Sequence, residues 1–150
     1  MAPQNAFQTL LGLETLSLRM KKHVSNARKI ANWLEQHPKI DKVTYAGLKS
    51  SKYYDLSKSV LPKGAGALFT ISLKEGYEAC IKMINKLNLF SHVSNLGDTR
   101  SLIIHPASTV HRQLTEQQQI NAGLAPNVIR LSIGIEDPKD LIDDLKQALE

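Results

Sequence analysis

The residue with the clearest chemical potential is Arg130, which lies in the apolar segment 127–133. Side chains alternate across a β-strand, so Ile129, Leu131 and Ile133 would share one apolar face and Arg130 would lie on the other. An arginine in this place can be a solvated residue on an edge strand, a partner in a structural ion pair, or a planar fork that binds a ligand carboxylate or phosphate. The segment alone leaves these three interpretations open.

The histidines and the cysteine indicate less chemistry. His105 and His111 have no Cys, Asp or Glu at a ligand-like spacing, so we expect no metal site. His105 precedes Pro106. This favours a rigid loop, in which the polar side chains bind the backbone, and makes a catalytic role for His105 the weaker interpretation. No serine lies in a recognisable nucleophile elbow, and the glycines at 64–66 lack the flanking strand and helix of a phosphate-binding loop. Cys80 would lie on the core side of a helix as a small apolar residue.

A long amphipathic helix is expected to precede the elements that position Arg130. The segment 6–36 contains no proline, Asn5 would be its N-cap, and Pro38 would end it. Apolar residues in it recur at steps of three or four, which is the helical period. They are Leu13, Leu16, Met20, Val24, Ala27, Ile30, Ala31 and Leu34.

The rest of the chain alternates irregularly between predicted strands and helices. Strands are expected at 42–45, 67–73, 90–93, 101–104 and 128–133, and a polar stretch without an assigned element separates the first two. Helices are expected around Cys80, at 116–122, and after Asp137 as N-cap with Pro138 as the first helical residue. This pattern predicts an α+β fold, in which a small, mostly antiparallel sheet has helices on one face. We expect one domain, with a linking helix at 1–36 and the sheet and helices at 37–150.

Composition limits the class of protein. A chain of 150 residues with 42% hydrophobic and 22% charged residues is typical of one globular domain, and it excludes collagen-like, disordered and membrane-spanning chains. Neither a signal peptide nor an apolar run of about 18 residues is visible, so a cytoplasmic protein is expected. The net charge of +5 is concentrated in the first hundred residues. Because only 5% of the residues are aromatic and no recognition motif accompanies the basic residues, we expect no nucleic-acid binding.

Three segments together resemble the C-terminal part of the Cys/Met-metabolism family of pyridoxal-phosphate enzymes. They are residues 95–98, 101–108 and 128–137, and the resemblance extends through 5–7, 12–16, 18–20 and 37–48. Within that family, residues 62–67, 90–92 and 111–115 are most similar to O-acetylhomoserine sulfhydrylases.

This resemblance implies the small C-terminal domain of a fold-type-I enzyme. The parent enzyme would use pyridoxal phosphate to replace the acetoxy group of O-acetylhomoserine with sulfide, giving homocysteine or methionine. Arg130 would correspond to the arginine that binds the substrate α-carboxylate, with Asn95 as a second donor and the backbone around Leu96 contributing. The implied partners are a large cofactor-binding domain and the substrates, in a homotetramer.

One feature of the family is missing from the sequence. Its members hold the cofactor as a Schiff base on a lysine in a Ser-Xaa-Thr-Lys context, and only Lys52 and Lys58 come near to that pattern. The resemblance therefore implies a small domain with no catalytic and no cofactor-binding residue of its own, which is inactive alone and binds no pyridoxal phosphate covalently. Two alternatives remain, namely a relative of cystathionine γ-synthase or γ-lyase, and a non-catalytic amino-acid-binding domain.

Overall fold

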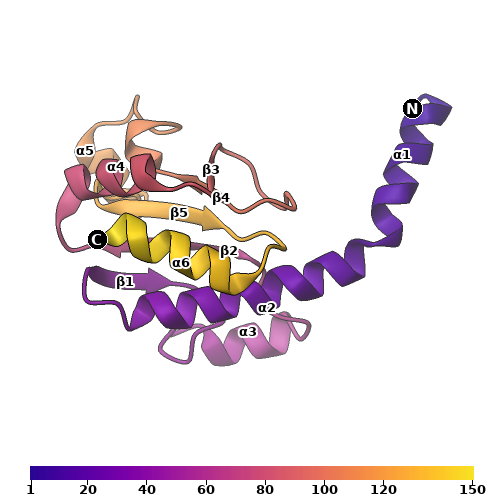
Figure 1. Cartoon of the computed structure of the whole chain (residues 1–150), viewed down its shortest axis with the longest axis horizontal. Coiled ribbons are helices and arrows are strands. Elements are labelled where there is room, and N and C mark those ends of the chain that lie inside the picture. Colours follow the sequence, from indigo (N-terminus) through magenta and orange to yellow (C-terminus); the bar gives the residue numbers. More distant parts are fainter.

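The computed structural model describes residues 1–150 and contains one five-stranded sheet (Figure 1). The strands are β1 (Ile40–Thr44), β2 (Leu68–Leu73), β3 (Ser91–His92), β4 (Leu102–Ile104) and β5 (Val128–Ser132), in the order β1-β2-β5-β4-β3. Neighbouring strands are antiparallel except for β3 and β4, which are parallel. The expected α+β fold with a mostly antiparallel sheet is confirmed, and β5 lies at its centre.

Three helices contribute buried side chains to the core above one face of the sheet. They are α2 (Leu16–Glu35), α4 (Gly76–Lys86) and α6 (Pro138–Leu149) (Figure 1). Ile129 and Leu131 of β5 are fully buried in this core, together with Leu141 and Leu145 of α6. Burying such a side chain contributes about 1.5 to 3 kcal/mol. The core therefore holds β5 rigidly from its helix-covered side.

The predicted start of α6 is confirmed. The Oδ1 atom of Asp137 accepts a hydrogen bond of 2.8 Å from the backbone N–H of Lys139, and Pro138 is the first helical residue. Two short helices precede β5 in the chain. They are the 3-10 helix η1 (Pro106–Ser108), which contacts β5, and α5 (Glu116–Asn121). No helix of the structure is both long and apolar enough to cross a membrane.

The prediction of one continuous linking helix at 1–36 is wrong. The structure has α1 (Pro3–Glu14) and then α2, separated by Thr15 at φ −99° and ψ 0°. The side chain of Arg19 donates to the carbonyl oxygen of Gly12 and to the hydroxyl of Thr15, at 2.5 and 3.2 Å, and so satisfies acceptors at the break. Asn5 is also not the N-cap, because the helix already begins at Pro3, whose fixed φ suits a first helical position.

The two helices differ in how they are packed. No residue of α1 is buried, and the helix projects away from the sheet (Figure 1). The apolar stripe expected along the whole segment is therefore covered only in its second half, from Ala27 to Leu34. A further helix, α3 (Tyr54–Val60), lies in the stretch to which the sequence assigned no element.

Candidate functional site

Arg130 lies on the central strand and points away from the helices. Its cross-strand partners are Thr70 on β2 and Ile104 on β4, and its neighbours Ile129 and Leu131 are fully buried under the helices. Because side chains alternate along a strand, the half-buried Arg130 side chain lies on the opposite face. A position on a solvated edge strand is therefore excluded.

Arg130 also takes no part in an ion pair. The three ion pairs of the structure join Lys39 to Glu75, Lys58 to Asp55 and Arg100 to Asp98. The only polar contacts of the Arg130 guanidinium are long: Nη2 donates to the carbonyl oxygen of Asn95 at 3.4 Å and to Oγ of Ser94 at 3.5 Å. A guanidinium has five N–H donors, so most of them have no protein acceptor. The structure therefore shows Arg130 neither on an edge strand nor in an ion pair.

The loop between β3 and β4 brings Asn95 beside Arg130. The Asn95 side chain is exposed, and its Oδ1 atom accepts a hydrogen bond of 2.9 Å from the backbone N–H of Leu96. In this conformation the Leu96 N–H is therefore already used, and the free donor of the pair is the Nδ2 group of Asn95. The Leu96 side chain is 64% exposed and has no role in the core.

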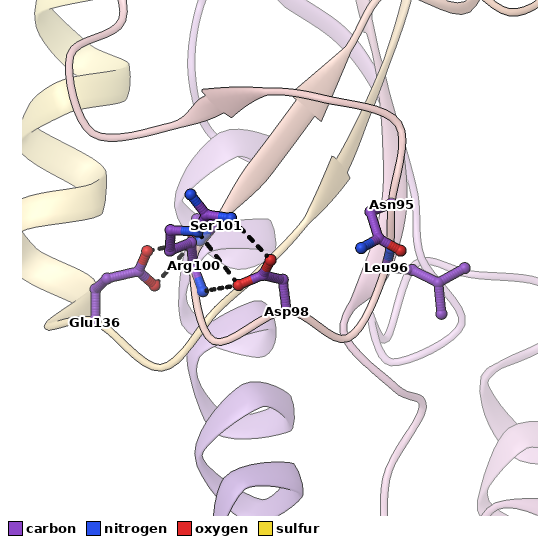
Figure 2. Close-up of polar contacts among 6 residues, drawn as sticks. All are labelled: Asn95, Leu96, Asp98, Arg100, Ser101 and Glu136. Carbon is purple, nitrogen blue, oxygen red and sulfur yellow. Dashed lines mark hydrogen bonds and ion pairs between the residues drawn. The ribbon is translucent and has the colours of Figure 1, made fainter. Parts of the chain in front are cut away.

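A carboxylate on each side fixes the far end of this loop (Figure 2). Asp98 pairs with Arg100 at 3.1 Å and also accepts from the Arg100 backbone N–H at 3.0 Å. The hydrogen bonds from Arg100 hold the pKa of Asp98 below its ordinary value, and the same contact raises the pKa of Arg100. Glu136 binds the backbone N–H and the hydroxyl of Ser101. Sequence reasoning missed Glu136, because its partner is 35 residues away and no local pattern links the two.

His105 has a structural environment, as the sequence favoured. The ring is fully buried, its Nε2 donates to the carbonyl oxygen of Pro126 at 2.7 Å, and its Nδ1 lies 2.9 Å from Oγ of Ser108. Tyr77 packs against this ring edge to face, with centroids 4.9 Å apart. The Cys80 thiol is buried, and burial raises its pKa to about 12, so it is not a nucleophile near neutral pH. No three His, Cys, Asp or Glu side chains are grouped to hold a metal ion.

The chain and its fold match a known family of enzymes. The model of the Cys/Met metabolism PLP-dependent enzyme family matches residues 1–150, and the chain belongs to that family. Enzymes of this family use pyridoxal phosphate.

The individual relatives include two kinds of enzyme. The chain is 47% identical over 150 residues to an O-acetyl-L-homoserine sulfhydrylase of Leptospira meyeri, covering 99% of this chain and 34% of the relative. It is 45% identical over 149 residues to O-acetyl-L-homoserine sulfhydrylase 1 of Thermus thermophilus, with 99% and 35% covered. An L-methionine gamma-lyase of Fusobacterium nucleatum is 41% identical over 150 residues, with 100% and 38% covered. The chain thus spans about a third of the length of these relatives.

A solved structure extends the likeness to three dimensions. The crystal structure of an O-acetylhomoserine (thiol)-lyase from Campylobacter jejuni, which contains a pyridoxyl-lysine monophosphate, matches with a TM-score of 0.92 at 48% identity. The match covers 99% of this chain and 35% of that one. The fold of this chain is therefore that of about a third of the Campylobacter jejuni structure.

A guanidinium with free donors, such as that of Arg130, can bind a carboxylate or a phosphate. The two lysines with the nearest sequence context lie elsewhere, since Lys52 stacks on Tyr53 at 4.8 Å and Lys58 on Tyr54 at 3.9 Å. Tyr53 borders a cavity along β1, and β2 separates β1 from β5. What the site offers is a set of free guanidinium donors beside an exposed carboxamide.

Proposed function

We propose that residues 1–150 form the substrate-binding C-terminal domain of a pyridoxal-phosphate-dependent O-acetylhomoserine sulfhydrylase. In this proposal the domain binds O-acetylhomoserine, whose acetoxy group is replaced by sulfide to give homocysteine, or by a small thiol to give methionine. The observation that carries the proposal is the half-buried guanidinium of Arg130, which lies on a rigid central strand without an ionic partner.

The role of Arg130 is to bind and orient the α-carboxylate of the substrate. A planar guanidinium can donate to both carboxylate oxygens at once, and each such charge-assisted hydrogen bond is worth about 1.5 to 3 kcal/mol. Two bonds from one plane also fix the direction of the amino acid, which lowers the entropic cost of reaching the reactive geometry. Asn95 adds a second donor through Nδ2, and the backbone at Leu96 borders the same carboxylate.

The domain needs partners for catalysis. We place the cofactor and its lysine in the larger domain of the whole enzyme, which we expect to be a homotetramer. Pyridoxal phosphate supplies the electron sink of the reaction, and the protein supplies binding and orientation. We therefore expect residues 1–150 alone to be inactive.

A methionine γ-lyase is the second candidate, because such an enzyme matches the same 150 residues at 41% identity. Both enzymes bind the α-carboxylate of an amino acid, so Arg130 serves either reaction. The sulfhydrylase is favoured because its relatives are more similar, at 45% and 47% identity.

Reciprocal chimeras test the choice. Residues 1–150 replace the matching third of the Leptospira meyeri sulfhydrylase in one chimera and that of the Fusobacterium nucleatum γ-lyase in the other. We expect the first to make homocysteine from O-acetylhomoserine and sulfide, and the second to lose most elimination from methionine, with both chimeras loaded with cofactor. The reverse pattern would favour the γ-lyase, and loaded chimeras without either activity would overturn the proposal.

A further inference from the structure

The loop that carries Asn95 is clamped at its C-terminal end by Glu136. The Oε1 atom of Glu136 accepts from the backbone N–H of Ser101 at 2.6 Å, and Oε2 accepts from the Ser101 hydroxyl at 2.9 Å (Figure 2). The same hydroxyl oxygen accepts from the backbone N–H of Gly134 at 2.8 Å. Ser101 is fully buried, so both donors would lack a partner without this carboxylate.

A second set of contacts fixes Glu136 itself. The Nδ2 group of Asn26 on α2 donates to the carbonyl oxygens of Gly134 and Glu136, at 3.1 and 2.8 Å. One turn earlier on α2, Nδ1 of His23 lies 2.6 Å from the carbonyl oxygen of Ile133, and it must be the donor because that oxygen only accepts. The clamp is thus attached to the packed helix layer.

There is no spare room in the clamp. A Cβ atom added at Gly134 would overlap the carbonyl oxygen of Thr99 and a carboxylate oxygen of Glu136. The backbone N–H of Ile135 also donates to the carbonyl oxygen of Thr99 at 2.9 Å. Segments 99–101 and 134–136 are therefore in direct contact.

The middle of the loop has no comparable support. Residues 93–97 are exposed, and their hydrogen bonds are local contacts and the two long bonds from Arg130. The position of Asn95 beside Arg130 therefore depends on the two ends of the loop. One end is the short pairing of β3 with β4, and the other is the Ser101 clamp.

We propose that Glu136 is a positioning residue for the substrate carboxylate. By holding both donors of Ser101, Glu136 keeps the 94–98 loop in the conformation that presents Asn95 and Leu96 next to Arg130. Both oxygens of its carboxylate accept hydrogen bonds from Ser101, so we infer that it acts through Ser101. This inference rests on the proposed function of Arg130.

The test uses Glu136→Gln in the Leptospira meyeri chimera. In the carboxamide an NH2 group replaces one oxygen and cannot accept a hydrogen bond. The Ser101 hydroxyl therefore loses its acceptor at that atom, while the shape of the side chain is kept. We expect the KM for O-acetylhomoserine to rise about tenfold, as misplacing a positioning group does, with a smaller change in kcat. Asp143→Asn is the matched control, since it removes a negative charge at an exposed position of α6 and should leave KM unchanged.

Two further measurements separate positioning from general stability. Ser101→Ala should raise KM as well, and its effect should not add to that of Glu136→Gln in the double variant, because both act through one contact. In the chain of residues 1–150, Glu136→Gln should speed amide hydrogen exchange at residues 94–98 and leave exchange within α6 unchanged. If Glu136→Gln fails to fold, Ser101→Ala replaces it in both the KM and the exchange measurements, and a raised KM with faster exchange at residues 94–98 is then the expected result.

The possible failures are distinguishable. An unchanged KM in Glu136→Gln, while Arg130→Ala raises KM strongly, would overturn the positioning role and leave the proposed function standing. An unchanged KM in Arg130→Ala would overturn the proposed function, and the positioning role with it. Lower thermal stability of Glu136→Gln without any change in KM would show a purely structural role and would also overturn the inference.

Discussion

Replacing Arg130 with lysine keeps the positive charge and removes the planar fork. A lysine can approach one carboxylate oxygen as a point charge but cannot donate along two parallel directions. The variant thus loses about one charge-assisted hydrogen bond, worth about 1.5 to 3 kcal/mol. The side chain is only half-buried, so we take the lower value, and about 1.4 kcal/mol corresponds to a factor of ten.

The stability of the fold should change little in this variant. Arg130 makes only two long contacts, at 3.4 and 3.5 Å, and no ion pair. Their loss should cost less than about 1 kcal/mol, which shifts the Tm of a domain of this size by less than about 4 °C. Activity and stability therefore respond differently if Arg130 binds a ligand.

The assay measures kcat/KM for O-acetylhomoserine in the Leptospira meyeri chimera, and the Tm of residues 1–150 by calorimetry. We expect Arg130→Lys to lower kcat/KM about tenfold, mainly through KM, and Arg112→Lys, at an exposed position, to change neither quantity. Unchanged kcat/KM would refute the carboxylate role. A large fall in Tm that parallels the loss of activity would instead make Arg130 a structural residue.

Three further results are expected from the packing. Leu145→Ala should lower the free energy of unfolding in urea by about 2 to 5 kcal/mol, because Leu145 is fully buried. Lys146→Ala, at an exposed position of the same helix, is the control. A loss of less than about 1 kcal/mol in Leu145→Ala would contradict the buried position of Leu145. Cys80 should not react with a thiol reagent at pH 8 until the protein unfolds, since burial raises its pKa to about 12, and fast labelling of the folded protein would contradict this. The exposed apolar side chains of α1 should make residues 1–150 self-associate. Leu10→Glu should then lower the sedimentation coefficient at high protein concentration, and the control Gln8→Glu should not. A monomer at all concentrations would contradict this expectation.

The sequence predicted those features that depend on local periodicity. The alternation along β5 places Arg130 opposite the helices, and Asp137 with Pro138 marks the start of α6. The break at Thr15 was not predictable in this way, because the apolar stripe continues across it and no proline interrupts the segment.

Other features depend on contacts that are distant in sequence. The helix α3 buries only Ser57, so it has no apolar stripe to reveal it, and the Ser57 Oγ atom lies 3.0 Å from the carbonyl oxygen of Ala46 in a preceding turn. Likewise, no local pattern in the sequence distinguishes Glu136 from other acidic residues that precede a helix. Only the fold brings it to Ser101, and only the fold shows that Arg130 has no acidic partner.

The parallel pairing of β3 with β4 has a consequence for how such a site can be altered. A chain that leaves one strand and enters a parallel neighbour must run back along the pair, and here residues 93–101 make that return beside strands with only two paired positions. At about 3.3 Å per extended residue, nine residues supply far more length than the return requires. The extra length lies in the exposed part of the loop, residues 93–97, which carries Asn95, so residues can be exchanged there without moving β5 or the core. Substitutions in this exposed part of the loop should therefore change the surroundings of Arg130 with little effect on folding stability.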